Sequence, residues 1–121
     1  MVEDGIVHIV KARNTQYYST VHIYAGTLGH IIRDHPEEAS RLVDVCKTIE
    51  APCRIYQSKT DPERSLALIN DKVTSTGGDP LRVIVKIVSD SEAIMKTAHF
   101  CSSNNHGTLL WEDTKDENRG N

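Results

Sequence analysis

This chain of 121 residues has its strongest β-strand signal at Leu81-Arg82-Val83-Ile84-Val85-Lys86-Ile87-Val88. Apolar and β-branched residues dominate the run, as is typical of a strand with one buried face. The turn-forming residues 89–92 follow, and a second strand-like stretch extends from Ile94 to Phe100. The two stretches predict an antiparallel hairpin.

A four-residue loop at 89–92 fixes the pairing of the two strands, with Val88 facing Ala93, Lys86 facing Met95, Ile84 facing Thr97, and Arg82 facing His99. One face then forms a core surface of Leu81, Val83, Val85, Ile87, Ile94, Ala98 and Phe100. The other face carries Arg82, Lys86, Thr97 and His99. A cationic, titratable surface on rigid strands is what a site for a phosphodiester requires. Any sheet that faces water on one side shows the same alternation, so both interpretations stay open.

Working outward toward the N-terminus, strand-like segments occupy 54–58 and 66–70, and turn-forming residues 59–64 lie between them. A helix precedes them. Asp34 with Glu37 forms a capping box, and Pro52 ends the helix near Glu50 or Ala51. Its apolar stripe consists of Ala39, Leu42, Val43, Cys46 and Ile49.

Two further β-like stretches, 6–10 and 21–25, predict an N-terminal hairpin that could place His8 opposite His22. Residues 27–33 could form a short helical turn. At the other end, residues 109–111 are an apolar anchor and 112–121 are expected to be disordered. We therefore expect one α+β domain over 1–111, with the strand pair and helix packed on a roughly four-stranded antiparallel sheet.

Composition limits the function classes. Hydrophobic residues make up 38% and charged residues 26%, as in ordinary globular domains. No apolar run approaches the roughly 18 residues that cross a bilayer, and the N-terminus is acidic, so a cytoplasmic location without membrane binding is expected. The net charge of −3 gives no global attraction to nucleic acid, and a polyanion site must be a local patch.

Cofactor and metal sites are not expected. The three cysteines, Cys46, Cys53 and Cys101, form no C-x-x-C pair, which indicates reduced thiols rather than a zinc site or disulfide framework. His30 and His35 lack H-E-x-x-H spacing. Glycine-rich nucleotide-binding motifs are absent from the sequence, so no nucleotide cofactor is expected.

A family resemblance covers about residues 27–100. It is carried by the order and spacing of five short segments: 29–37 (Gly-His-Ile-Ile-Arg-Asp-His-Pro-Glu), 49–52 (Ile-Glu-Ala-Pro), 58–64 (Ser-Lys-Thr-Asp-Pro-Glu-Arg), 81–87 and 97–98. The chain resembles the phage-associated members of the barnase, EndoU, colicin and RelE-like nuclease superfamily. The resemblance implies helices followed by a four-stranded antiparallel sheet, and a toxin-like endoribonuclease that cleaves RNA without a metal ion.

The same resemblance implies roles for individual residues. His30 resembles the family's helical histidine, Arg64 its basic residue after the Asp-Pro turn, and Thr97 its polar residue in the last strand; His99 shares the side of Thr97. His30 and His99 would act as base and acid on the way to a cyclic phosphate. Arg64, Lys86 and Arg82 would hold the phosphate, and Ser58 and Lys59 would contribute to substrate binding. The implied partners are an RNA such as tRNA and a cognate inhibitor or immunity protein.

Two other functions remain open from the sequence alone. The first is a non-enzymatic interaction module, an immunity-type protein or phage accessory factor, which suits the low pI of about 6.0. The second is a nucleic-acid binder without chemistry, which would need a broad basic surface and a steep salt dependence. Convergence of His30, Arg64, Lys86 and His99 within reach of one phosphate distinguishes a nuclease from either.

Overall fold

The computed structural model of the protein describes residues 5–34, 42–59, 61, 63–102 and 107–113, with the backbone alone for 30–34. Its helices are α1 (Ala25–Asp34) and α3 (Leu42–Glu50). Its strands are β1 (Ile6–Lys11), β2 (Thr20–Tyr24), β3 (Arg54–Gln57), β4 (Ser65–Thr74), β5 (Pro80–Ile87), β6 (Glu92–Phe100) and β7 (Thr108–Glu112). Within the described residues no helix is long and apolar enough to cross a membrane.

The seven strands of the described residues belong to one sheet in the order β1-β2-β6-β5-β4-β3-β7. Neighbouring strands are antiparallel except β2 and β6, which are parallel. The predicted α+β class is confirmed, but the expected number of about four strands was too small. The N-terminal hairpin joins the central sheet through β2 and β6, and the apolar anchor near the C-terminus forms β7 on the edge of β3.

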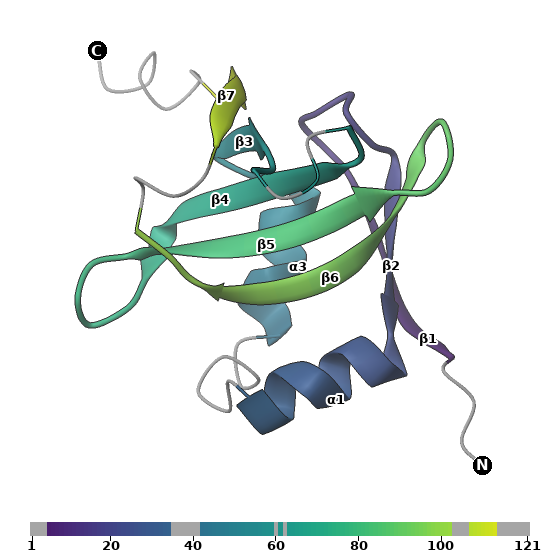
Figure 1. Ribbon diagram of the computed structural model, residues 1–121, viewed down its shortest axis with the longest axis horizontal. Coiled ribbons are helices and arrows are strands. Elements are labelled where there is room, and N and C mark those ends of the chain that lie inside the picture. Colours follow the sequence, from purple (N-terminus) through teal and green to yellow (C-terminus); the bar gives the residue numbers. More distant parts are fainter. Residues whose placement is uncertain (1–4, 35–41, 60, 62, 103–106, 114–121) are drawn as a thin grey trace.

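The sheet curls around α3, so that segments from its two ends meet (Figure 1). The loop between β1 and β2 contacts β7, which lies at the opposite end of the strand order. The Tyr17 hydroxyl donates a hydrogen bond of 3.1 Å to the carbonyl of Leu110, and the Asn14 amide donates one of 3.4 Å to the Asp113 carboxylate. Glu112 and Asp113, expected at the start of a disordered tail, are therefore ordered.

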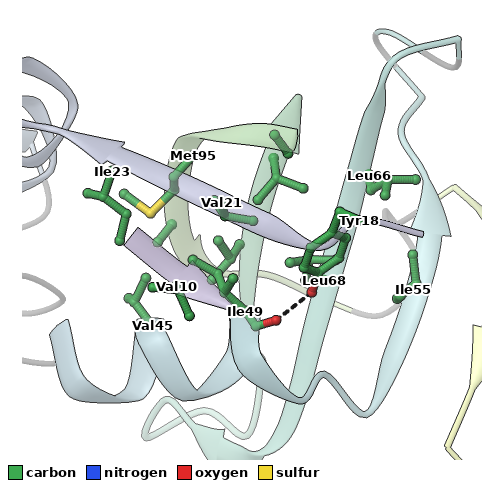
Figure 2. Close-up of a cluster of buried hydrophobic side chains, with 14 of the residues drawn as sticks. Val10, Tyr18, Val21, Ile23, Val45, Ile49, Ile55, Leu66, Leu68 and Met95 are labelled. Carbon is green, nitrogen blue, oxygen red and sulfur yellow. Dashed lines mark hydrogen bonds between the residues drawn. The ribbon is translucent and has the colours of Figure 1, made fainter. Parts of the chain in front are cut away.

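Helix α3 packs against β1, β4 and β5 through the stripe that Val45 and Ile49 mark (Figure 2). Val43, which the sequence placed on this stripe, is 65% exposed. The spacing i, i+3, i+7 from Leu42 selects Val45 and Ile49, and Val43 lies one step around the helix. The helix ends at Glu50, as Pro52 predicted, whereas the expected cap at 34–37 lies largely outside the described residues.

The β5–β6 hairpin has the predicted register over half its length. Arg82 pairs with His99 and Ile84 with Thr97, but beyond an irregularity at Lys96 the partner of Lys86 is Ile94 instead of Met95. One extra residue in β6 reverses the alternation, as a β-bulge does. Met95 is therefore buried in the core and Ile94 lies on the opposite face, which corrects the predicted faces.

The N-terminal hairpin does not pair the two histidines. His8 lies opposite Ile23 and Ile9 opposite His22, because the register shifts between Ile6 and His8. Ala25, expected at the end of the second strand, begins α1. Cys46, Cys53 and Cys101 are half-buried free thiols.

Candidate functional site on the open face

The face of strands β3 to β6 opposite α3 is called the open face, because no described helix covers it; it faces the reader in Figure 1. Residues paired across an antiparallel ladder point to the same side of the sheet. Pairing therefore assigns three rows to the open face: Arg54, Ile69, Arg82 and His99; Tyr56, Ala67, Ile84 and Thr97; and Ser65, Lys86 and Ile94.

Arg82 and His99 are in direct polar contact on the open face. The Arg82 Nε lies 3.0 Å from the Nε2 atom of His99, and a terminal guanidinium nitrogen lies 2.6 Å from the same atom. A guanidinium can only donate, so Nε2 accepts and the imidazole proton resides on Nδ1. Protonation of Nε2 would end this contact and place two cations side by side. The pair thus holds an imidazole nitrogen against a permanent positive charge.

Buried apolar residues of β4 lie between the polar residues of the open face. Ile69 is 0% exposed and Ala67 is 1% exposed, although neither belongs to the core cluster on the helix side. Ile69 pairs with Arg54 on one neighbouring strand and with Arg82 on the other. The apolar stems of arginine cover such a residue while the charged ends stay accessible. Arg54 and Arg82 therefore flank a fully buried apolar residue, Ile69.

Arg54, which lies beside Tyr56, is a member of this face that the sequence did not single out. Arg54 donates to both carboxylate oxygens of Asp71, at 3.0 and 2.5 Å, and to the Tyr56 hydroxyl at 2.6 Å. Burial opposes the charge of Arg54, but the hydrogen bond and charge of Asp71 together raise its pKa. The alternation of Arg54 and Tyr56 about buried Ile55 was a usable signal; the partner Asp71 was not visible in sequence.

A second group of polar residues gathers where the β3–β4 turn meets the end of β5. This turn cluster comprises Ser58, Lys59, Arg64 and Lys86. The Ser58 amide donates to the Ser65 carbonyl at 3.0 Å, the Ile87 amide donates to the Arg64 carbonyl at 2.8 Å, and Ser65 pairs with Lys86. Arg64 and Lys59 are exposed, whereas Ser58 is buried. The backbones of four of the predicted residues therefore lie at one end of the sheet.

The turn cluster and the Arg82–His99 pair do not share one phosphate. Lys86 and Arg82 are four residues apart on β5, which separates their backbones by roughly 13 Å at about 3.3 Å per residue. Thr97 lies between them on the neighbouring strand, opposite Ile84. Of the residues expected to converge, the structure brings His99 into contact with Arg82. Arg64 neighbours Lys86 only along the backbone, because it lies opposite Ile87, a residue on the helix side of β5.

His30 lies in α1, which contacts β2 and β6 and runs alongside β6 in Figure 1. The parallel register pairs β2 with only the first residues of β6, up to Ile94. Helix α1 follows β2 directly and so flanks the part of β6 that carries Thr97 and His99. The His30 side chain itself lies outside the described residues.

The described residues contain no group of three or more histidine, cysteine or carboxylate side chains able to hold a metal ion. Comparisons with protein-family models, curated proteins and solved structures find no match to the chain. The candidate site therefore rests on the geometry of the open face alone.

Proposed function

We propose that the open face binds RNA and cleaves it without a metal ion, with Arg82 and His99 at the reacting phosphodiester. The observation that carries the proposal is their direct contact on adjacent, paired strands. A cation and a titratable imidazole, held together on a rigid sheet, are the two groups that transesterification of RNA needs most.

The contact suggests how substrate would activate His99. An anionic phosphate oxygen is a stronger acceptor for a guanidinium than an imidazole nitrogen is. A bound phosphodiester would therefore attract the Arg82 donors and release the lone pair of Nε2. Nε2 would then take the proton of the ribose 2′-hydroxyl, and the 2′-oxygen would attack phosphorus.

The remaining steps require a cation and a proton donor. Arg82 would stabilise the charge that grows on the phosphorane oxygens. As the bond from phosphorus to the 5′-oxygen breaks, an acid must protonate that oxygen, leaving a 2′,3′-cyclic phosphate. His30 is the proposed acid because α1 lies alongside β6. Thr97 shares the open face with His99 and is proposed to position the same phosphate.

The turn cluster would hold the RNA backbone on one side of the cleaved bond. Arg64 and Lys59 are exposed, and Lys86 is half-buried on the open face. At roughly 13 Å from Arg82, Lys86 is too distant for the reacting phosphate and suits a neighbouring one. The same turn also carries Asp61 and Glu63, so these three cations leave a small local excess of positive charge on a chain whose net charge is −3.

The test is incubation of total tRNA with wild type, His99→Ala, Arg82→Ala and His30→Ala in excess EDTA, followed by analysis of the fragment ends. Wild type should give discrete fragments with cyclic phosphates, and each variant should lose about 10²- to 10⁴-fold in rate. His8→Ala is the matched control, since His8 is an exposed histidine of the edge strand β1, which does not pair with any strand of the open face, and should leave the rate unchanged.

Intact RNA with the wild-type protein would overturn the proposal. Tight RNA binding with a steep salt dependence and no cleavage would instead indicate a binder without chemistry.

A second candidate function is protein interaction through β1, which forms one end of the strand order. Ile6, Val7 and Ile9 are 46%, 46% and 58% exposed there. Exposed β-branched residues on an edge strand favour addition of a strand from another chain. Protein interaction through β1 becomes the preferred function if the wild-type protein leaves the RNA intact.

A further inference from the structure

A pocket of about 490 Å³ opens where the β1–β2 loop meets β7, and Asn14, Gln16, Tyr17 and Trp111 line it. The open face is not part of it, because Trp111 pairs with Ile55, a core residue on the helix side of β3. The pocket exists because the sheet curls, since its walls come from opposite ends of the strand order. We call it the seam pocket.

Asn14 is held in one orientation. Its amide nitrogen donates to the Pro52 carbonyl at 3.3 Å and to the Asp113 carboxylate at 3.4 Å. Both partners are acceptors, so the amide nitrogen must face them and the oxygen must point elsewhere. That oxygen, Oδ1, is buried and has no hydrogen-bond partner among the described residues. A buried acceptor without a donor calls for a functional or structural explanation.

The other walls supply aromatic surface and a second amide. Tyr17 is 40% exposed, and its hydroxyl is already bound to the Leu110 carbonyl, which fixes the ring beside β7. Trp111 is half-buried, and Gln16 is exposed. Its described lining thus combines two rings with two carboxamides, and none of these four residues is charged.

From this lining we infer that the seam pocket binds an unpaired nucleobase. A base offers a flat π-surface that stacks on tyrosine or tryptophan, and an edge of N–H donors and carbonyl acceptors that pairs with carboxamides. An exocyclic amine or ring N–H would supply the donor that Asn14 Oδ1 lacks, and Gln16 would pair with the same edge.

The role of the seam pocket in RNA recognition rests on the proposed function. The row from His99 through Arg82, Ile69 and Arg54 to Glu112 crosses five strands, a span of roughly 19 Å at about 4.8 Å per strand. A single-stranded RNA cleaved at His99 would follow this row to β7 and insert a base at the seam. The pocket would then select which base lies a few nucleotides from the cleaved bond.

The test uses Trp111, the one tryptophan of the chain, as the probe. The four nucleoside 5′-monophosphates are titrated against the intrinsic fluorescence of the full chain, with ribose 5-phosphate as the control that lacks a base. At least one nucleotide should give saturable quenching and ribose 5-phosphate should give none. Tyr17→Ala should weaken the binding roughly 5- to 150-fold, the range expected for loss of one base stack.

Two further variants separate stacking from damage to the fold. Tyr17→Phe keeps the ring and should retain base binding, whereas Gln16→Ala removes an exposed amide and should weaken binding without changing the unfolding midpoint. The inference is overturned if nucleotides quench no more than ribose 5-phosphate does, or if Tyr17→Ala and Gln16→Ala bind as wild type. Base binding without RNA cleavage would leave the seam pocket standing and remove the proposed function. Cleavage without base binding would do the reverse.

Discussion

Single side chains define the helix side of this fold as sharply as the open face. Tyr18 is 1% exposed, and its hydroxyl donates to the Ile49 carbonyl at 2.5 Å in the last turn of α3 (Figure 2). The final carbonyls of a helix have no partner within it, so this hydroxyl satisfies one of them. Burial raises the pKa of the Tyr18 phenol well above its usual value.

Tyr18→Phe should lower the free energy of unfolding at pH 7 by about 1–2 kcal/mol, because it leaves the Ile49 carbonyl buried without a donor. The loss should shrink as pH rises above about 10, where the unfolded tyrosine ionises and the folded one stays neutral. Because its pKa is higher in the folded state, Tyr18 stabilises the wild type fully below about pH 10, and this stabilisation is lost as the pH rises further. Tyr18→Phe has no ionisable group at this position, so its stability does not change through this effect. Urea unfolding at pH 7 and pH 11 measures both effects.

The control for this prediction is Tyr24→Phe, which alters a half-exposed tyrosine of β2. It should change the unfolding free energy by less than about 0.5 kcal/mol. The wild type and Tyr18→Phe should not differ in unfolding free energy by the same amount at both pH values. An equal difference would contradict a raised pKa at Tyr18.

Among the elements, the position of α3 in the chain follows from sequence pattern, whereas the face that it buries follows from packing. A hydrophobic period predicted the helix and Pro52 predicted its C-terminus, and in the structure the helix ends at Glu50. Which apolar residue faces the sheet was decided by contact with β1, β4 and β5. Thr48 adds a polar contact that no period reveals, since its hydroxyl accepts a hydrogen bond of 3.1 Å from the Asn70 amide of β4.

Ile49→Ala should lower the free energy of unfolding by about 2–5 kcal/mol, because Ile49 is 0% exposed and its loss leaves a cavity. Val43→Ala, on the same helix but 65% exposed, should cost less than about 0.5 kcal/mol. Denaturant unfolding of the pair checks the assigned face of α3. Equal costs, or a larger cost at Val43, would mean that the helix is rotated relative to the sheet.

At the scale of the whole molecule, the sheet has an exposed apolar edge at β1. Ile9 is the most exposed of the apolar residues there, and its backbone lies on an edge strand that another chain can extend. Ile9→Lys should reduce concentration-dependent association, because a charge on an edge strand opposes strand addition. Sedimentation velocity across a range of protein concentrations measures this, with Lys96→Ala as the control on β6. Self-association that persists unchanged in Ile9→Lys would exclude β1 as the contact surface.

The sequence by itself determined the local elements and much of the hairpin that carries the candidate site. Alternation in 81–88, four turn residues and a second alternating strand were enough to pair Arg82 with His99. These are short-range properties, set by side-chain direction and turn length. For the same reason the sequence placed Ser58, Lys59 and Arg64 in or beside one turn.

Only the tertiary structure decided how distant segments meet. The bulge at Lys96 moved Ile94 to the open face, because burial of Met95 against the core outweighed a regular ladder. The parallel pairing of β2 with β6 brought α1 alongside the strand that carries His99. Curling of the sheet brought Asn14 and Tyr17 to β7 and made the seam pocket. Each outcome depends on contacts between residues far apart in the chain, which no local pattern specifies.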